Sequence, residues 1–111
     1  MITTHVLDLA SGGPAVGVTV ILELRQGSEW APVGRGVTDN NGRLSSLTEG
    51  RAVVPGAYRL TFDIAAYLRE HGTAMPFFQE ARIVFNIRDT SRDYHVPLLL
   101  SPFGYSTYRG A

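Results

Sequence analysis

Several features that mark other protein classes are missing from this sequence, and each absence excludes a class of protein or site. No cysteine occurs among the 111 residues, which excludes disulfide bonds and thiolate metal sites. No apolar run approaches the roughly 18 residues of a membrane-spanning helix. Residues 1–5 lack the basic stretch and following apolar segment of a secretory signal. We therefore expect a cytoplasmic protein that contacts no membrane.

An excess of charge is also missing. Ten basic and ten acidic residues cancel, whereas a protein that follows a phosphate backbone usually carries a clustered basic excess. We therefore expect no nucleic-acid partner. The length fits one domain over residues 1–111, with no internal repeat or linker. Without disulfides, its stability has to come from core packing, alone or together with subunit association.

Short segments of alternating apolar and polar residues dominate the chain. Glycine and proline separate them, which is typical of an all-β sandwich. The clearest segment is 18–25, where every second residue from Val18 is apolar. The turn at 39–42 suits a tight hairpin, and Arg43 starts the next extended segment. With that segment, the expected seven or eight strands lie at 3–9, 18–25, 30–37, 57–62, 81–87, 94–100 and 105–108.

One segment, residues 63–72, departs from the β pattern and predicts a helix of about two turns. Asp63 can cap the free N–H groups at its start. Gly72 can adopt the left-handed conformation at its end. Ile64, Tyr67 and Leu68 form an apolar stripe at helical spacing. We expect this helix to pack on a sheet edge or a loop.

The three histidines differ in their surroundings. His71 lies at the expected helix C-terminus, where a structural role explains it. His5 and His95 lie inside strands, on the face opposite the apolar positions expected in the core, which are Val6, Tyr94, Val96, Leu98 and Leu100. Taken alone, the pattern favours ordinary surface histidines. Apolar residues share their face, however, which indicates cover by a second subunit.

Other candidate groups are individually weak. Two histidines are too few for a closed zinc site, and Asp8 alternates to the face opposite His5. Arg43, taken alone, has two interpretations: a solvated arginine, or a planar donor of hydrogen bonds to carbonyl or carboxylate oxygens. The C-terminal tail, residues 106–111, runs straight out of a hairpin, which indicates that it is held in place.

Three stretches together give a specific resemblance. Over nearly its whole length the chain resembles the transthyretin-like 5-hydroxyisourate hydrolases. The matching stretches are Thr4-His5-Val6-Leu7-Asp8, Thr38-Asp39-Asn40-Asn41-Gly42-Arg43 and the long ungapped run from Tyr94 to Gly110. The resemblance implies a transthyretin-like (prealbumin-like) sandwich of two four-stranded antiparallel sheets with one short helix. It also implies a homotetramer, a dimer of dimers, with sites where subunits meet in a central channel.

The resemblance also implies which residues act. The family's catalytic histidine, arginine and second histidine fall on His5, Arg43 and His95. Its substrate-binding positions fall on His5 and Arg43 and on four residues of the tail, which are Tyr108, Arg109, Gly110 and Ala111. Ala111 departs from the family pattern, which ends in serine, so the hydroxyl at this position is missing. No metal or cofactor is implied.

The implied reaction belongs to urate degradation. Water attacks a ring carbonyl of 5-hydroxyisourate, and 2-oxo-4-hydroxy-4-carboxy-5-ureidoimidazoline forms. A neutral histidine suits the removal of the water proton, and either His5 or His95 can serve. Two other functions compete: a transthyretin-type carrier of small apolar molecules, and a structural β-sandwich without a site. The carrier would share the fold but lack the set of His5, Arg43 and His95.

Overall fold

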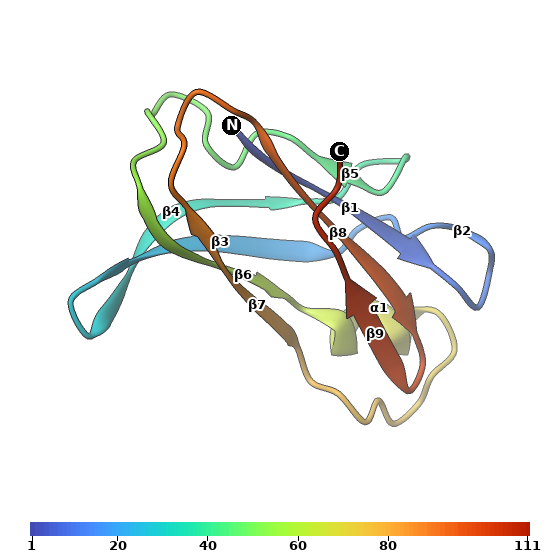
Figure 1. The fold of residues 1–111 in the computed structure, drawn as a ribbon. Coiled ribbons are helices and arrows are strands. Elements are labelled where there is room, and N and C mark those ends of the chain that lie inside the picture. Colours follow the sequence, from blue (N-terminus) through green and yellow to red (C-terminus); the bar gives the residue numbers. More distant parts are fainter.

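The alternating segments form strands in the computed structural model, which describes all 111 residues (Figure 1). Each expected strand is confirmed to within two residues at either end. The elements in chain order are β1 (Ile2–Asp8), β2 (Gly13–Pro14), β3 (Thr19–Gln26), β4 (Glu29–Val37), β5 (Arg43–Leu44), β6 (Gly56–Phe62), α1 (Ile64–Glu70), β7 (Ala81–Ile87), β8 (Tyr94–Ser101) and β9 (Gly104–Thr107).

The strands form two sheets, as a sandwich requires. One sheet has the order β2-β1-β8-β9, with β5 also paired to β1, and the other has the order β4-β3-β6-β7. Two details differ from the expected pair of four-stranded antiparallel sheets. The first sheet has five strands instead of four, because two strands of two residues each, β2 and β5, both pair with β1. The β1–β8 pair runs parallel, which is possible because the whole second sheet, and no tight hairpin, connects these strands.

The core lies between the sheets and follows the period of two. In β1 the buried and half-buried residues alternate without exception. The large side chains that are fully buried come from both layers, among them Val6, Leu22, Leu60, Phe62 and Leu98. Burial of one face of each sheet in this way is the main source of stability for a domain without disulfides.

Helix α1 follows β6 at one end of the sandwich, and its expected signals are confirmed. The Asp63 carboxylate accepts a hydrogen bond from the Ala66 N–H at 3.3 Å, and Gly72 has a φ of +99° after the last turn. The stripe of Ile64, Tyr67 and Leu68 is buried. With seven residues, α1 is too short to cross a membrane.

Both ends of the chain meet at the start of β8. The carbonyl of Met1 accepts a hydrogen bond from the Tyr94 N–H at 2.9 Å, and the Gly110 N–H donates to the His95 carbonyl at 2.8 Å. In Figure 1 the two termini accordingly lie near one another above β1 and β8. The first strand and the last residues therefore flank His95 from two sides.

Candidate functional site

The outer face of the five-stranded sheet carries both strand histidines. In β1 the half-buried positions are Thr3, His5 and Leu7, and in β8 they include His95 and Leu99. We call these five residues the histidine face. The expectation that His5 and His95 point away from the core is therefore confirmed.

The turn at 39–42 brings Arg43 to this face. The Asp39 carboxylate accepts hydrogen bonds from the N–H groups of Asn41 at 2.8 Å and Arg43 at 3.0 Å. Gly42 has a φ of +73°, and a Cβ there would lie 2.4 Å from the Val6 carbonyl oxygen. Only glycine fits this turn. The chain then pairs with β1 so that Arg43 is the partner of His5.

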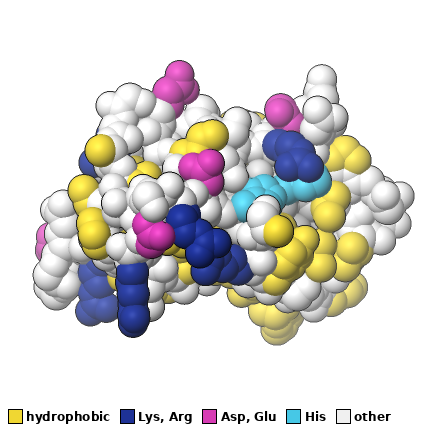
Figure 2. All heavy atoms as spheres, turned by 45° about the horizontal axis from the view of Figure 1, so that its top comes forward, with side chains coloured by type: hydrophobic (Ala, Val, Ile, Leu, Met, Phe, Trp, Pro, Cys, Tyr) yellow, Lys and Arg dark blue, Asp and Glu magenta, His cyan; other side chains and the backbone are white.

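Arg43 borders two hollows, one with each histidine. Arg43 and His5 line one shallow hollow, together with Leu7 and Asn41. Arg43 also lines a second hollow, together with His95 and other residues. Figure 2 shows histidine side chains in one continuous patch, with a basic side chain against them. The structure therefore brings together the three side chains that the resemblance implies, from β1, β5 and β8.

Charge in this group favours a neutral His95. Burial of the ring lowers the pKa of His95 below its ordinary value, and the positive charges of Arg43 and His5 lower it further. The pKa of the Asp39 carboxyl is also below its ordinary value, because the N–H groups of Arg43 and Asn41 bind the charged form. The site thus combines an arginine cation, a carboxylate anion and an imidazole whose surroundings favour its neutral form.

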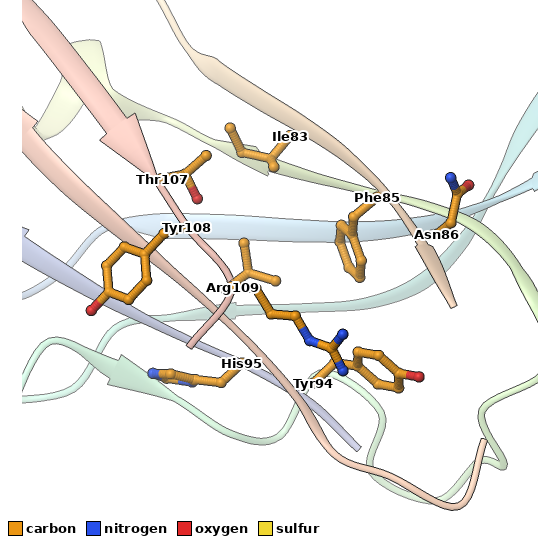
Figure 3. A pocket seen from close by; sticks show the side chains of 9 residues that line it. Ile83, Phe85, Asn86, Tyr94, His95, Thr107, Tyr108 and Arg109 are labelled. Atoms are coloured by element: carbon orange, nitrogen blue, oxygen red, sulfur yellow. The ribbon is translucent and has the colours of Figure 1, made fainter. Parts of the chain in front are cut away.

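The tail continues the β8–β9 pairing past the end of β9. The Thr107 hydroxyl donates to the Pro97 carbonyl at 2.7 Å, and Gly110 forms an antiparallel bridge with His95. Strand alternation then puts Tyr108 and Gly110 on the side of His95. In Figure 3 the Tyr108 ring lies on the same side as His95.

Arg109 points to the opposite side of the sheet from this group. Its guanidinium carbon lies 5.0 Å from the centre of the Tyr94 ring. The side chain borders a hollow of about 240 Å³ that also contacts Ile83 and Phe85 of β7. Figure 3 shows the guanidinium directed toward Tyr94 and away from His95. Arg109 was expected in substrate binding. The structure directs its guanidinium to Tyr94 rather than to His5 or Arg43, because neighbouring residues of a strand point to opposite faces. The hollow that it borders is also lined by His95 and Tyr108.

The path of the tail depends on Gly110. A Cβ at this position would lie 2.6 Å from Cδ2 of His95 and 3.2 Å from its Cγ. The backbone therefore passes directly against the imidazole edge, which any larger residue would prevent. Ala111 follows and is exposed.

Sequence reasoning missed one residue of the site, Thr3. Its hydroxyl oxygen lies 2.8 Å from Nδ1 of His95. The alternation of β1 already assigns Thr3 to the face of His5. The contact depends on the parallel register that pairs Thr3 with His95, and no local pattern encodes that register. No group of three or more His, Cys, Asp or Glu side chains lies close enough together to hold a metal ion.

Comparison with known proteins gives consistent matches over the whole chain. Residues 2–110 match the family model for transthyretin, described as the HIUase/Transthyretin family. A protein of Salmonella typhimurium named 5-hydroxyisourate hydrolase is 42% identical over 111 residues, which are all of this chain and 81% of that protein. A protein of the same name from Deinococcus radiodurans is 43% identical over 113 residues, covering 99% of this chain and 95% of its own length.

The fold also matches a solved structure. The crystal structure of sea bream transthyretin in complex with thyroxine superposes with a TM-score of 0.92 at 32% identity. The superposition covers 99% of this chain and 94% of the transthyretin chain. The sandwich of two sheets with one short helix is therefore the transthyretin fold. Similarity of fold alone does not separate an enzyme from a carrier.

Proposed function

We infer that this chain, which belongs to the HIUase/Transthyretin family, hydrolyses 5-hydroxyisourate. The observation that carries this inference is the assembly of half-buried His5 and His95 and exposed Arg43 on one face of the sheet. The relatives named 5-hydroxyisourate hydrolase match over the full length of the chain, which supports it. The proposed reaction is a step of urate degradation, in the cytoplasm that the sequence predicts.

The proposed chemistry is a water-dependent ring opening. The oxygen of water adds to a ring carbonyl carbon, and the C–N bond of that carbonyl breaks. The carbon remains as a carboxyl group and the nitrogen takes up a proton, which gives 2-oxo-4-hydroxy-4-carboxy-5-ureidoimidazoline. Water is a weak nucleophile at neutral pH, so a positioned base that removes its proton accelerates the reaction by about 10²–10⁴.

We assign the base role to His95, which the sequence left open between the two histidines. Its lowered pKa supports this assignment, because the neutral imidazole is the form that accepts a proton. His5 then orients the water or protonates the leaving nitrogen. Arg43, which lines one hollow with His5 and another with His95, donates hydrogen bonds to the oxygen on which negative charge develops. Asp39, a carboxylate on the border of the site, limits the net positive charge.

The tail completes the proposed pocket. Tyr108 and Gly110, on the side of His95, form one wall, and Ala111 follows at the position where the family pattern has serine. If that serine only holds substrate, its absence costs about 0.5–1.5 kcal/mol. Turnover of the chain beside an Ala111→Ser variant measures this directly: equal rates mean that the hydroxyl is dispensable. For Arg109 we propose only a backbone contribution to this wall, since its side chain packs on Tyr94.

We also propose that the chain acts as a homotetramer, a dimer of dimers with sites at the interface. Half-buried Leu7 and Leu99 lie among the polar groups of the histidine face, which supports cover by another subunit. The outermost strands β7 and β9 each have a free edge. Phe77, in the loop before β7, is 75% exposed. Apolar groups and free strand edges of this kind are commonly covered by another chain.

A transthyretin-type carrier is the second candidate function. The similarity to a transthyretin solved with thyroxine favours it. The polar set of His5, Arg43 and His95 counts against it, because a site for an apolar ligand carries few charged groups. Turnover separates the two functions, since a carrier leaves its ligand unchanged.

The test of the proposed function follows the ultraviolet decay of freshly generated 5-hydroxyisourate. The purified chain should accelerate this decay, and His5→Asn or His95→Asn should each lower kcat/KM by about 10²–10⁴. His71→Asn, which changes the histidine at the end of α1, is the matched control and should keep the full rate. Unchanged decay with the unmodified chain contradicts the hydrolase assignment. Full rates in both site variants, at unchanged oligomeric state, contradict the histidine mechanism.

A further inference from the structure

The hydroxyl of Thr3 contacts one of the two ring nitrogens of His95. Thr3 Oγ1 lies 2.8 Å from His95 Nδ1. The two residues are partners in the parallel β1–β8 pair, and both belong to the half-buried histidine face. Partners in neighbouring strands project to the same side of a sheet, so this contact follows directly from the register.

A second contact holds the opposite edge of the same ring. The backbone of Gly110 passes so close to His95 Cδ2 that a Cβ there would lie at 2.6 Å. A half-turn flip of the ring would exchange Nδ1 with Cδ2 and break the hydrogen bond to Thr3. The tail therefore limits the space around the ring, and the hydrogen bond to Thr3 selects the orientation in which Nε2 is the nitrogen left free for substrate.

The orientation of the ring matters because only one nitrogen of a neutral imidazole can act as a base. In a neutral imidazole one ring nitrogen carries the proton and the other has a lone pair that accepts a proton. The hydrogen-bond partner of one nitrogen determines which of the two tautomers is present. The positive charge of Arg43 acts on His95 and disfavours an N–H directed into the hollow that both residues line. A proton on Nδ1 instead meets the oxygen of Thr3, which can accept it.

We propose that Thr3 is a positioning residue for the hydrolysis: its hydroxyl accepts the Nδ1–H of His95 and keeps the lone pair of Nε2 toward the attacking water. This role rests on the proposed function. The proton taken from water goes to Nε2, and the resulting imidazolium keeps its Nδ1–H···Oγ1 bond throughout. A base held in the productive tautomer needs no reorganisation at the moment of reaction.

Isosteric variants separate this role from a purely structural one. Thr3→Val keeps the β-branched shape and removes only the hydroxyl, whereas Thr3→Ser keeps the hydroxyl. Loss of a partner that orients a metal-ligating histidine typically costs about 10- to 100-fold, and a histidine base that loses its orienting partner should show a loss of the same order. We therefore expect Thr3→Val to lower kcat by about that factor with a small change in KM, and Thr3→Ser to restore most of the rate. Thr61→Val, at a half-buried strand threonine of β6 in the other sheet, is the matched control and should keep the full rate.

The tautomer itself is measured independently of turnover, by ¹⁵N NMR of the histidine rings, with His95 assigned through the His95→Asn variant. In the unmodified chain the proton of His95 should reside on Nδ1, and Thr3→Val should shift the population toward Nε2–H. A proton on Nε2 of the unmodified chain overturns the proposal, whichever variants fold. A full rate in folded Thr3→Val also overturns it and leaves the hydrolase assignment intact. If the unmodified chain shows no turnover, the proposed function fails, while the tautomer still decides whether Thr3 orients His95.

Discussion

His95 shows how the surroundings of one side chain adapt it to a role. An ordinary histidine is half protonated near pH 6.5. Burial of the ring and the nearby charges of Arg43 and His5 lower the pKa of His95 below that value. The ring is therefore neutral over a wider range of pH than a solvated histidine, and a general base has to be neutral to act.

This shift predicts the pH dependence of the reaction. The base form of His95 is lost only when the pH falls below its lowered pKa, so the acid limb of kcat/KM should lie below about pH 6.5. Removal of the Arg43 charge by Arg43→Gln should raise the pKa of His95. A histidine titration followed by NMR measures both values. A His95 pKa at or above its ordinary value in the unmodified chain would contradict the electrostatic account.

Gly110 gives a second prediction at a single position. In Gly110→Ala the new Cβ would overlap the His95 ring, so the ring or the tail has to move. A displacement of about 1 Å in a site can cost about 10²-fold in rate, and we expect kcat to fall by up to that factor. Thermal unfolding should barely change, because the tail contributes little to the core. The control is Gly104→Ala in the β8–β9 turn, where a Cβ meets only Ser101 Oγ at 3.7 Å; equal losses in both variants would contradict a specific effect on His95.

Between elements, one polar contact ties α1 to the end of β1. The Tyr67 hydroxyl donates to the Asp8 carboxylate at 2.6 Å, and both residues are buried. Burial raises the pKa of Asp8, but the hydrogen bonds from Tyr67, Ser11 and Ala10 outweigh it, so the pKa lies below its ordinary value. Asp8, which alternates away from His5 as the sequence predicts, therefore stabilises the fold as an anion.

Tyr67→Phe should weaken this tie between helix and strand. A hydrogen bond to a charged group contributes about 1.5–3 kcal/mol, and we expect a loss of that size in the free energy of unfolding at neutral pH. Since the folded pKa of Asp8 is lowered, its contribution is present above the ordinary pKa of a carboxyl group. The contribution is lost as the pH falls through the folded value. The difference between the two proteins should therefore shrink in acid.

Denaturant unfolding at several pH values and one fixed protein concentration measures this difference. Tyr105→Phe is the control, because Tyr105 lies on β9 and is partly exposed. A constant difference across the pH range would show that Asp8 is not the group involved.

In the whole molecule, the two outer faces of the sandwich differ in what they expose. The histidine face combines its titratable groups with half-buried Leu7 and Leu99. The outer face of the other sheet instead carries an ion pair between Arg59 and Glu23 at 2.8 Å, and Arg59 also lies over the Trp30 ring. The asymmetry agrees with the proposed assembly, in which the histidine face meets another subunit.

Leu99→Glu tests this assembly. A carboxylate on the histidine face should prevent its burial by another subunit. We expect a smaller particle by light scattering, together with loss of most of the hydrolysis. Ile21→Glu, on the half-buried outer side of β3 in the other sheet, is the matched control and should change neither property. An unmodified chain that is monomeric at working concentration would contradict the proposed tetramer.

Local physical chemistry was enough to predict the longer strands and the helix of this protein, though not the two-residue strand β2. The period of two in 18–25 locates β3, because one side of each strand needs burial. The cap at Asp63 and the apolar stripe with Tyr67 and Leu68 locate α1, since both act within a few residues. The same alternation put His5 and His95 on the non-core face. The motifs around these histidines and Arg43 identified the family, as the full-length match confirms.

What remained open depends on contacts between residues that are distant in the sequence. No local pattern encodes that β1 runs parallel to β8, yet this register brings Thr3 to His95. The side of the sheet that Arg109 faces follows from the bridge between Gly110 and His95. These features are tertiary because each depends on which strand lies beside which, and that choice is made by packing of the whole sandwich.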